Sequence, residues 1–266
     1  MKVRAYDFEY DGINLSDRNF TICSFGDKGL NTISNGAQIS FNTVSTLGGS
    51  KHELTSAVYE DCLETTIQIC KNSCVGDIAE ISSTEFREMA KWLSRKKFLK
   101  FKILDEDYID LYFEAAFNIS RIEIDGRLYG LELEIRTNRP YALKEPRIIN
   151  IKNLEQNGKH SINDISHEEG FIYPHTEIII TESGDLNIHN AIENRNTIIT
   201  NCVAGEVITM DYPIIQSSLQ SHNIQNDFNW NFFRVANTFE NSRNDLTISI
   251  PCTIKVTYSP IVKVGL

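Results

Sequence analysis

One segment of the chain carries apolar residues at helical spacing. These residues fall at positions i, i+3, i+4 and i+7: Phe86, Met89, Ala90 and Leu93. Just before them, the Ser82 side chain can accept from the backbone of Glu85, whose carboxylate can reach back to Ser82, as in a capping box. The spacing therefore predicts an amphipathic helix over residues 83–96, with Trp92 packing at the edge of its apolar stripe.

The best hairpin signal lies between residues 118 and 136. Asp125-Gly126 suits a two-residue type I′ turn, which pairs Ile124 with Arg127 and Ile122 with Tyr129. That register places the apolar side chains on one face, namely Ile122, Ile124, Tyr129, Leu131, Leu133 and Ile135. The acidic side chains then lie on the other face, namely Glu123, Glu132 and Glu134. A hairpin of this kind is suited to packing on a sheet or lining a ring.

Most other segments alternate between apolar and polar residues or are short apolar runs, as strands do. In the first half of the chain these segments are residues 38–44, 63–69, 98–104 and 111–119. Residues 138–147 hold two of the six prolines and predict a linker. From Phe171 onward, regular short strands with turns between them indicate an antiparallel β-sandwich. We therefore expect a mainly β protein with one clear helix and two domains, residues 1–145 and 146–266.

Composition and charge narrow the classes of function. The net charge is −10 and the pI is about 5.1, which argues against a nucleic-acid binder because phosphate contacts need clustered Lys and Arg. Residues 1–12 are charged and lack the apolar stretch of a signal peptide, and the apolar runs elsewhere are too short to cross a membrane. We therefore expect synthesis in a host cytoplasm, no membrane insertion, and six cysteines present as reduced thiols.

Two clusters contain metal-binding residue types without the spacing of a known motif. Cys70 and Cys74 are spaced C-x3-C close to Cys62, but the second pair that a zinc site needs does not follow. A polar region holds three histidines and two carboxylates that could bind a divalent metal: His160, His167, His175, Glu168 and Glu169. Their spacing places them on no common face of a helix or strand. Buried thiols and a polar loop are therefore the favoured interpretations.

Acidic residues also gather at two places along the chain. Asp105, Glu106, Asp107 and Asp110 form a turn without the Gly and the terminal Glu of an EF-hand loop. Asp7, Glu9 and Asp11 alternate as the polar side of a first strand. Paired carboxylates can serve in a glycosidase, which remains a weaker alternative. Because no nucleophile elbow, phosphate loop, Rossmann fingerprint or zincin motif occurs, we expect no enzyme, no catalytic residue, no metal and no cofactor.

The segment Asn229-Trp230-Asn231-Phe232-Phe233 permits two interpretations. In the first, Trp230, Phe232 and Phe233 plug one end of the sandwich. In the second, an exposed Trp230 flanked by the amides of Asn229 and Asn231 contacts a glycan, because the ring offers an apolar face and the amides bind hydroxyls. The plug is the favoured interpretation.

Segments spread over nearly the whole chain share their order and spacing with one known family. In the first half they are residues 7–12, the helix ending at Trp92-Leu93, and the strands running up to Pro140-Tyr141-Ala142. In the second half they are residues 171–174, 183–185, 229–239, 244–248 and 258–264, with the strand ending at Asp211. Together they resemble the distal tail proteins of phages with long, flexible tails.

This resemblance implies a hexameric ring in the virion. Its N-terminal domains, similar to tail-tube subunits, would form a belt around a channel, and its C-terminal domains would be galectin-like sandwiches. The ring would join the tail-tube protein to the tail-tip protein and carry receptor-binding proteins where present. An acidic inner surface would let DNA pass by like-charge repulsion.

A ring needs an interface that closes on itself, and edge strands or long hairpins suit that purpose. The predicted hairpin is our candidate for the subunit contact, through Ile122, Ile124, Tyr129, Leu131 and Leu133. The alternative function is a carbohydrate-binding adhesion module that recognises host-wall glycans through Trp230 and its two flanking amides.

Overall fold

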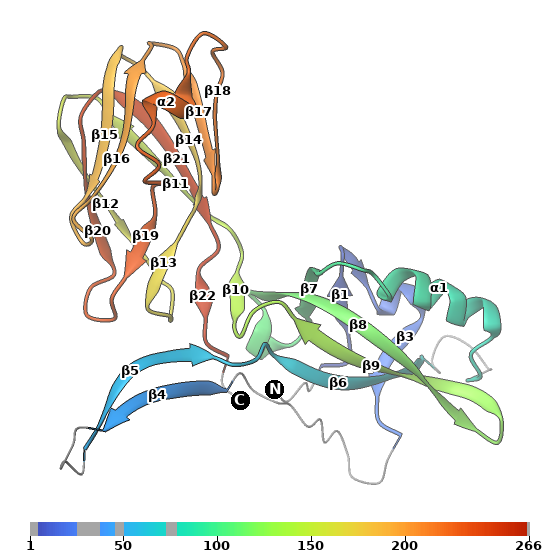
Figure 1. Cartoon of the computed structure of the whole chain (residues 1–266). Coiled ribbons are helices and arrows are strands. Elements are labelled where there is room, and N and C mark those ends of the chain that lie inside the picture. Colours follow the sequence, from blue (N-terminus) through green and yellow to red (C-terminus); the bar gives the residue numbers. More distant parts are fainter. Residues whose placement is uncertain (1–4, 26–37, 46–50, 73–78, 265–266) are drawn as a thin grey trace. The chain divides into compact units, whose positions relative to one another are not determined.

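A computed structural model describes residues 5–25, 38–45, 51–72 and 79–264 of the chain. The fold is mainly β, as predicted, and it divides into two compact units, each with its own hydrophobic core (Figure 1). The first unit comprises Met1–Leu143 with Lys263–Leu266, and the second comprises Lys144–Val262. The sequence placed the division at residue 145, two residues further along.

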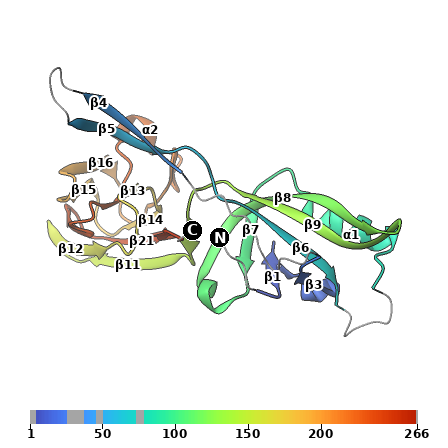
Figure 2. The same cartoon turned by 90° about the horizontal axis from the view of Figure 1, so that it is seen from below.

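The first unit is built on one antiparallel sheet in the strand order β2-β1-β7-β8-β9-β6-β3 (Figure 2). These strands are β2 (Ile13–Asn14), β1 (Phe8–Tyr10), β7 (Leu99–Ile103), β8 (Leu111–Ile124), β9 (Arg127–Thr137), β6 (Glu64–Lys71) and β3 (Phe20–Cys23). One short strand, β10 (Ala142–Lys144), extends the sheet beside β8. The predicted linker thus contains a strand. Two 3-10 turns, η1 (Ser16–Arg18) and η2 (Glu106–Tyr108), complete the unit.

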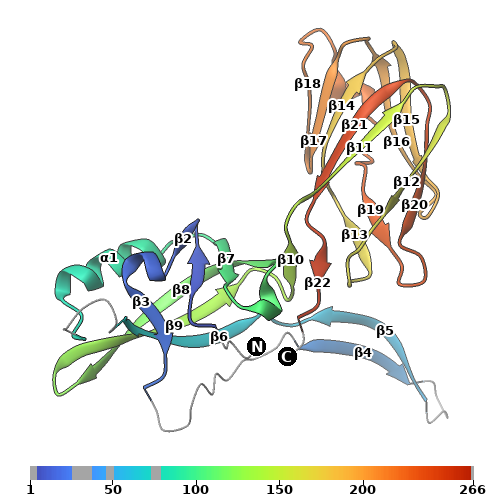
Figure 3. The same cartoon turned by 180° about the vertical axis from the view of Figure 1, so that it is seen from behind.

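Helix α1 (Ser83–Leu93) packs on one face of this sheet (Figure 3). Its capping box is confirmed, since Ser82 accepts from the backbone N–H of Glu85 and the Glu85 carboxylate accepts from that of Ser82. The helix ends three residues before the predicted end, because the backbone of Ser94 leaves helical geometry.

The buried face of α1 meets an aromatic core. Trp92 is buried, as predicted, and its indole N–H donates to the backbone carbonyl of Tyr10 at 3.1 Å. Its ring stacks on Phe8 with centroids 5.9 Å apart. The other buried phenylalanines of this core are Phe20, Phe101, Phe113 and Phe117. Aromatic contacts of this kind stabilise a core beyond the area that they bury.

The predicted Asp-Gly turn joins β8 to β9. Asp125 and Gly126 have φ angles of 50° and 77°, and Ile124 pairs with Arg127. These are the positive values that a type I′ turn requires. The turn chemistry was therefore correctly predicted.

A β-bulge next to this turn changes the predicted register. The irregularity lies between Ile122 and Glu123, so Ile122 pairs with Gly130 rather than with Tyr129. Because side chains alternate between faces along a strand, the shift places Ile122 on the face opposite to Leu131. The predicted single apolar face is thus divided between the two sides of the sheet.

The second unit is a sandwich of two antiparallel sheets (Figure 1). One sheet has the order β11 (Arg147–Asn153), β21 (Cys252–Tyr258), β14 (His175–Ile180), β17 (Val207–Asp211) and β18 (Ile214–Ser217). The other has the order β12 (Gly158–Asn163), β20 (Arg243–Ile248), β15 (Gly184–Asn190) and β16 (Arg195–Cys202). A small pair, β13 (Gly170–Ile172) and β19 (Val235–Asn237), and the one-turn helix α2 (Ile224–Asp227) lie outside these sheets.

Candidate functional site

One hairpin of the first unit stands apart from its main sheet. Strand β4 (Ile39–Ser45) pairs with β5 (His52–Tyr59), and within the described parts of the chain neither pairs with any other strand (Figure 3). At its base, the backbone N–H of Glu60 donates to the carbonyl of Gln38 at 2.9 Å. An isolated two-stranded hairpin is marginally stable in water, so this element is one that a partner would stabilise.

The two faces of this hairpin differ in polarity. One face is apolar along most of its length: Ile39, Phe41, Leu54, Ala57 and Tyr59. The opposite face is polar apart from Val44 and Val58, and on it Asn42 donates to Ser56 at 2.9 Å. Phe41 on the apolar face is 63% exposed. Fully burying one such side chain contributes about 1.5–3 kcal/mol, so covering this face would be strongly favourable.

The five predicted interface residues on β8 and β9 do not share one surface. Leu131 and Leu133 are fully buried in the core of their own unit, so they are not available to a neighbour. Ile122 lies on the opposite face because of the bulge. The remaining two, Ile124 and Tyr129, lie at the hairpin tip. Together with Asp125 and Arg127 they line a hollow of about 470 Å³. Of the five predicted residues, Ile124 and Tyr129 at the tip are therefore the two that share a surface.

The face of the main sheet that turns away from α1 is polar. Its carboxylates come from four strands of the sheet: Glu64, Glu114, Glu132, Glu134 and Glu9. Lys100 and Lys102 of β7 lie on the same face. Side-chain amides hold two of the carboxylates, since Gln68 donates to Glu132 and Asn118 to Glu134, both at 3.0 Å. Arg136 forms an ion pair with Glu64. The result is an ordered hydrophilic face, which one side of an antiparallel sheet can present to water.

The aromatic segment of the second unit agrees in part with each of the two interpretations of its sequence. Phe232 and Phe233 are buried and fill the sandwich, as the plug interpretation predicts. Trp230 is 55% exposed, although its ring centroid lies 5.7 Å from that of Phe228 and 6.4 Å from that of Phe232. Its φ angle is 58°, a left-handed conformation that is unusual for a bulky side chain. The backbone therefore turns this one ring outward.

The side chain of Asn229 holds this turn in place. Its Oδ1 accepts from the backbone N–H groups of Ile198 and Asn231, and its Nδ2 donates to the carbonyl of Asn196 at 3.0 Å. Both ends of the amide thus form hydrogen bonds within the protein. Asn229 and Asn231 are both exposed beside Trp230, and their role as glycan contacts stays a prediction.

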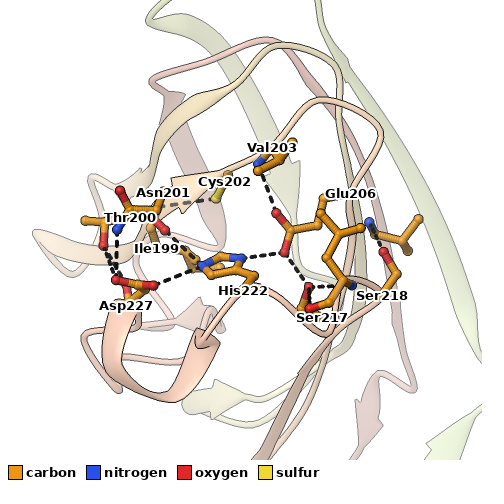
Figure 4. A network of polar contacts seen from close by, with 12 residues as sticks. Ile199, Thr200, Asn201, Cys202, Val203, Glu206, Ser217, Ser218, His222 and Asp227 are labelled. Carbon is orange, nitrogen blue, oxygen red and sulfur yellow. Dashed lines mark hydrogen bonds and ion pairs between the residues drawn. The ribbon is translucent and has the colours of Figure 1, made fainter.

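A buried polar network lies next to this segment (Figure 4). His222 Nδ1 lies 2.5 Å from Glu206 Oε1, and His222 Nε2 lies 3.1 Å from the carbonyl of Thr200 and 3.4 Å from Asp227 Oδ2. The two central side chains are almost completely buried, with exposed fractions of 3% for His222 and 0% for Glu206. Ser217 Oγ donates to the same Glu206 oxygen at 2.5 Å. This network was not predictable from the sequence, because its members share no motif.

These residues contain the chemical groups of a hydrolytic triad but not its arrangement. In a triad the imidazole accepts the proton of the nucleophilic hydroxyl, whereas here Ser217 bonds to the carboxylate and both ring nitrogens of His222 have other partners. The network instead fastens β16, β17, β18 and α2 together. Burial alone would raise the pKa of Glu206, but the bonds from Ser217, Val203 and His222 hold it below its usual value.

The predicted metal candidates do not converge in the described residues. In those ranges no group of three or more His, Cys, Asp or Glu could hold a metal ion. His160 lies 3.0 Å from the Asn153 amide, while His175 lies near Asp211 on another strand. Cys74 lies outside the described residues. The described cysteines are free thiols: Cys23, Cys62, Cys70, Cys202 and Cys252.

The acidic clusters have local structural roles. Asp105 caps the turn η2, with its Oδ1 accepting from the backbone of Asp107 at 3.0 Å. Asp7 accepts from the hydroxyl of Ser16 at 2.6 Å.

In the part of the chain that the structure describes, no helix has the length and apolarity needed to cross a membrane.

Comparison with known proteins identifies the family. Residues 3–139 match the family model described as a phage tail protein N-terminal domain, and residues 141–258 match the one described as a phage tail C-terminal domain. This chain belongs to that family of phage tail proteins. It is therefore a virion component, and the family resemblance drawn from the sequence is confirmed at this level.

Among solved structures, the chain is similar to the Dit protein (gp 19.1) of phage SPP1. That structure is described as a paradigm of the hub adsorption apparatus in phages that infect Gram-positive hosts. The TM-score is 0.65 with 11% identity, and the match covers 95% of this chain and 98% of that chain. At this identity the likeness establishes the shared fold. No curated protein sequence matches the chain.

Proposed function

We propose that this phage tail protein is a structural subunit of the tail-tip hub, which acts by assembly rather than by catalysis, and that identical copies form a closed ring. The β4–β5 hairpin carries the proposal, because it is an amphipathic element whose apolar face is exposed at Ile39, Phe41 and Leu54. A second copy of the chain is the partner that a homomeric ring supplies.

A possible acceptor lies at one end of the main sheet of the same unit. Tyr6, Leu104 and Ile109 are exposed there, where β1 begins and β7 ends. The backbone N–H of Leu104 donates to the carbonyl of Asp7 at 3.2 Å, which places Leu104 beside the residue that follows Tyr6. A hairpin on one copy that covers a different patch on the next makes a heterologous interface, which generates a ring when the rotation closes.

The remaining features fit a hub. Six copies are expected from the resemblance to distal tail proteins, and the likeness to the SPP1 hub protein supports the same role. In such a ring, the polar face of the main sheet would line the channel. The expected partners are the tail-tube protein, the tail-tip protein and, where present, receptor-binding proteins. The chain would be made in the host cytoplasm and would need no metal or cofactor.

Native mass spectrometry followed by electron microscopy tests the ring. The unmodified protein should form a six-fold ring with a central channel. Replacing both Phe41 and Leu54 with Glu should give folded monomers, whereas Val44→Glu, which places a charge on the opposite face, should keep the ring. An intact ring in the double variant would show that the hairpin is not the contact. A protein that stays monomeric at high concentration would remove self-assembly from the proposal.

A second candidate function is glycan binding by the C-terminal sandwich. The observation that favours it is Trp230, whose ring is exposed by an unusual backbone conformation rather than packed into the core. Large exposed rings on a soluble protein often mark a binding surface.

A further inference from the structure

We propose that Trp230 and Tyr212 form one preorganised platform that stacks on the hexose units of a neutral glycan. This inference rests on the second candidate function above and gives it a composite site and a ligand class. The sequence drew attention only to Trp230 and its two neighbours. The structure adds a second ring from the β17–β18 turn and shows what holds both in place.

The two rings belong to one patch. Tyr212 is 55% exposed, and its ring lies flat on that of Tyr173, with centroids 4.2 Å apart and an interplanar angle of 12°. Its edge also meets the buried ring of Phe232 at 5.3 Å. Because Trp230 contacts the same Phe232 at 6.4 Å, one buried ring supports both exposed rings. Aromatic contacts of this kind are favourable beyond the area that they bury, so they fix the exposed rings.

The backbone that presents Trp230 is fastened at several points by the residues before it. Before it, Asp227 accepts from the Thr200 hydroxyl at 3.2 Å and from the Asn201 amide at 2.9 Å, next to the buried imidazole of His222. Immediately before it, Asn229 binds three backbone groups. A left-handed non-glycine residue costs about 1–2 kcal/mol, and such strain persists only where the surroundings over-determine it. The effect of this strain is to expose the indole.

The surroundings of the platform fit a neutral polyhydroxylated ligand. The amide of Asn231 is exposed next to Trp230. The Arg234 guanidinium is neutralised by Glu193, with an Nε–Oε2 distance of 2.9 Å, and it lies over the ring of Phe171 at 3.8 Å. A pyranose offers an apolar C–H face to an aromatic ring and hydroxyls to amides, which matches this combination of apolar rings and uncharged polar groups.

A protein partner is less favoured by the same observations. The core of a protein interface is a contiguous apolar surface, whereas the chain neighbours of Trp230 are exposed amides and the adjoining Phe228 and Phe232 are buried. The other nearby cation, Arg195, donates its Nε–H to the carbonyl of Phe232 at 3.4 Å. The exposed rings of Trp230 and Tyr212, bordered by uncharged amides, are better suited to sugars.

Tryptophan fluorescence of the full-length protein gives a direct readout. The chain has two tryptophans, and since Trp92 is buried, a ligand that contacts the surface reports through Trp230. The probes are cellotriose, maltotriose and the trimer of N-acetylglucosamine, with isothermal titration calorimetry as the second measurement. We expect saturable binding of at least one probe with little dependence on salt, because no ion pair is formed.

The main variant is Trp230→Asn, because Asn tolerates a left-handed backbone and should leave the turn intact. Calorimetry should show binding weakened about tenfold or more, as for other aromatic hot spots. Tyr212→Ala should also weaken it, and Trp230→Phe should retain part of it. The control is Leu154→Ala, which truncates an exposed apolar side chain on another turn of the same unit and should change nothing. Near-ultraviolet circular dichroism checks that each variant is folded.

Four results would overturn the proposal. These are no binding of any probe, equal binding by Trp230→Asn, a steep loss of binding with salt, or capture of a purified tail protein through Trp230 while no sugar binds. Native mass spectrometry of Trp230→Asn tests the glycan proposal independently of the ring proposal. A ring that persists while sugar binding is lost supports the platform, and failure of the ring in the hairpin variant leaves the sugar result unaffected.

Discussion

Replacing Glu206 with Gln tests whether its buried charge holds the C-terminal unit together. The change keeps the shape of the side chain and removes the negative charge. In the native protein this carboxylate accepts from the backbone of Val203 at 3.0 Å, and from Ser217 and His222 at 2.5 Å each. An amide can accept only at its oxygen, so one of these donors would face an NH2 group.

The expected cost follows from these contacts. A hydrogen bond to a charged group contributes about 1.5–3 kcal/mol, against about 0.5–1.5 kcal/mol for a neutral one. Removing one partner of a buried pair costs about 3–5 kcal/mol, and Gln should cost less because it keeps one acceptor and the volume. We therefore expect a loss of about 2–3 kcal/mol, which for a unit of this size lowers Tm by roughly 10 °C.

The effect should depend on pH in a defined direction. Burial alone would raise the pKa of Glu206, but its hydrogen bonds lower that pKa below the ordinary value. A carboxylate with a lowered folded-state pKa contributes stability above its unfolded pKa of about 4.3, and this is lost as pH falls through the folded pKa. The native protein and the Gln variant should differ fully near neutral pH and converge in acid.

Differential scanning calorimetry of the full chain, at neutral and acidic pH, measures this difference. The matched control is Glu182→Gln, which makes the same chemical change at an exposed position of the same unit and should leave Tm within about 2 °C. If Glu206→Gln had the same Tm as this control at neutral pH, the charge of Glu206 would contribute nothing to stability. A difference that grew toward acid would show that the sign of the linkage is wrong.

Two further predictions concern the N-terminal unit. Leu133→Glu should prevent folding because it places a charge in a core that is fully closed, whereas Ile124→Glu at the exposed hairpin tip should fold normally, as judged by circular dichroism and thermal melting; equal behaviour of the two would contradict the assigned faces. Ser82→Ala should cost about 1 kcal/mol in urea unfolding through loss of the helix cap, and Ser82→Asp should restore most of it. Unchanged stability in the alanine variant would show that the cap contributes little.

Local chemistry in this chain was predictable where a few neighbouring residues determine the conformation. The Ser82–Glu85 capping box and the Asp125-Gly126 turn both formed as their sequences indicate. The bulge after Ile122 was not predictable, because it depends on how the whole of β9 fits against β8. A one-residue slip of this kind transfers side chains to the other face, so faces are harder to predict than strands.

Strand β5 was missed for a similar reason. A bulge at its centre shifts the phase between Leu54 and Ala57, and this obscures the alternation on which strand prediction depends. The outward position of Trp230 was also beyond sequence reasoning, since a Trp in left-handed backbone runs against its own preference. The only local hint is the preceding Asn229, a residue type whose side chain often stabilises tight turns.

The two proposed surfaces differ in what supports them, and this difference bears on their roles. The β4–β5 hairpin has one pair of strands and an uncovered apolar face, so a partner would add directly to its stability, as any ligand of the folded state does. Trp230 is held by buried rings and by the three hydrogen bonds of Asn229, so its exposure does not depend on a partner. An element that gains order on contact suits permanent assembly, whereas a surface already in place loses little entropy on binding and suits a reversible ligand. This contrast is why we assign ring formation to the hairpin and glycan recognition to the aromatic platform.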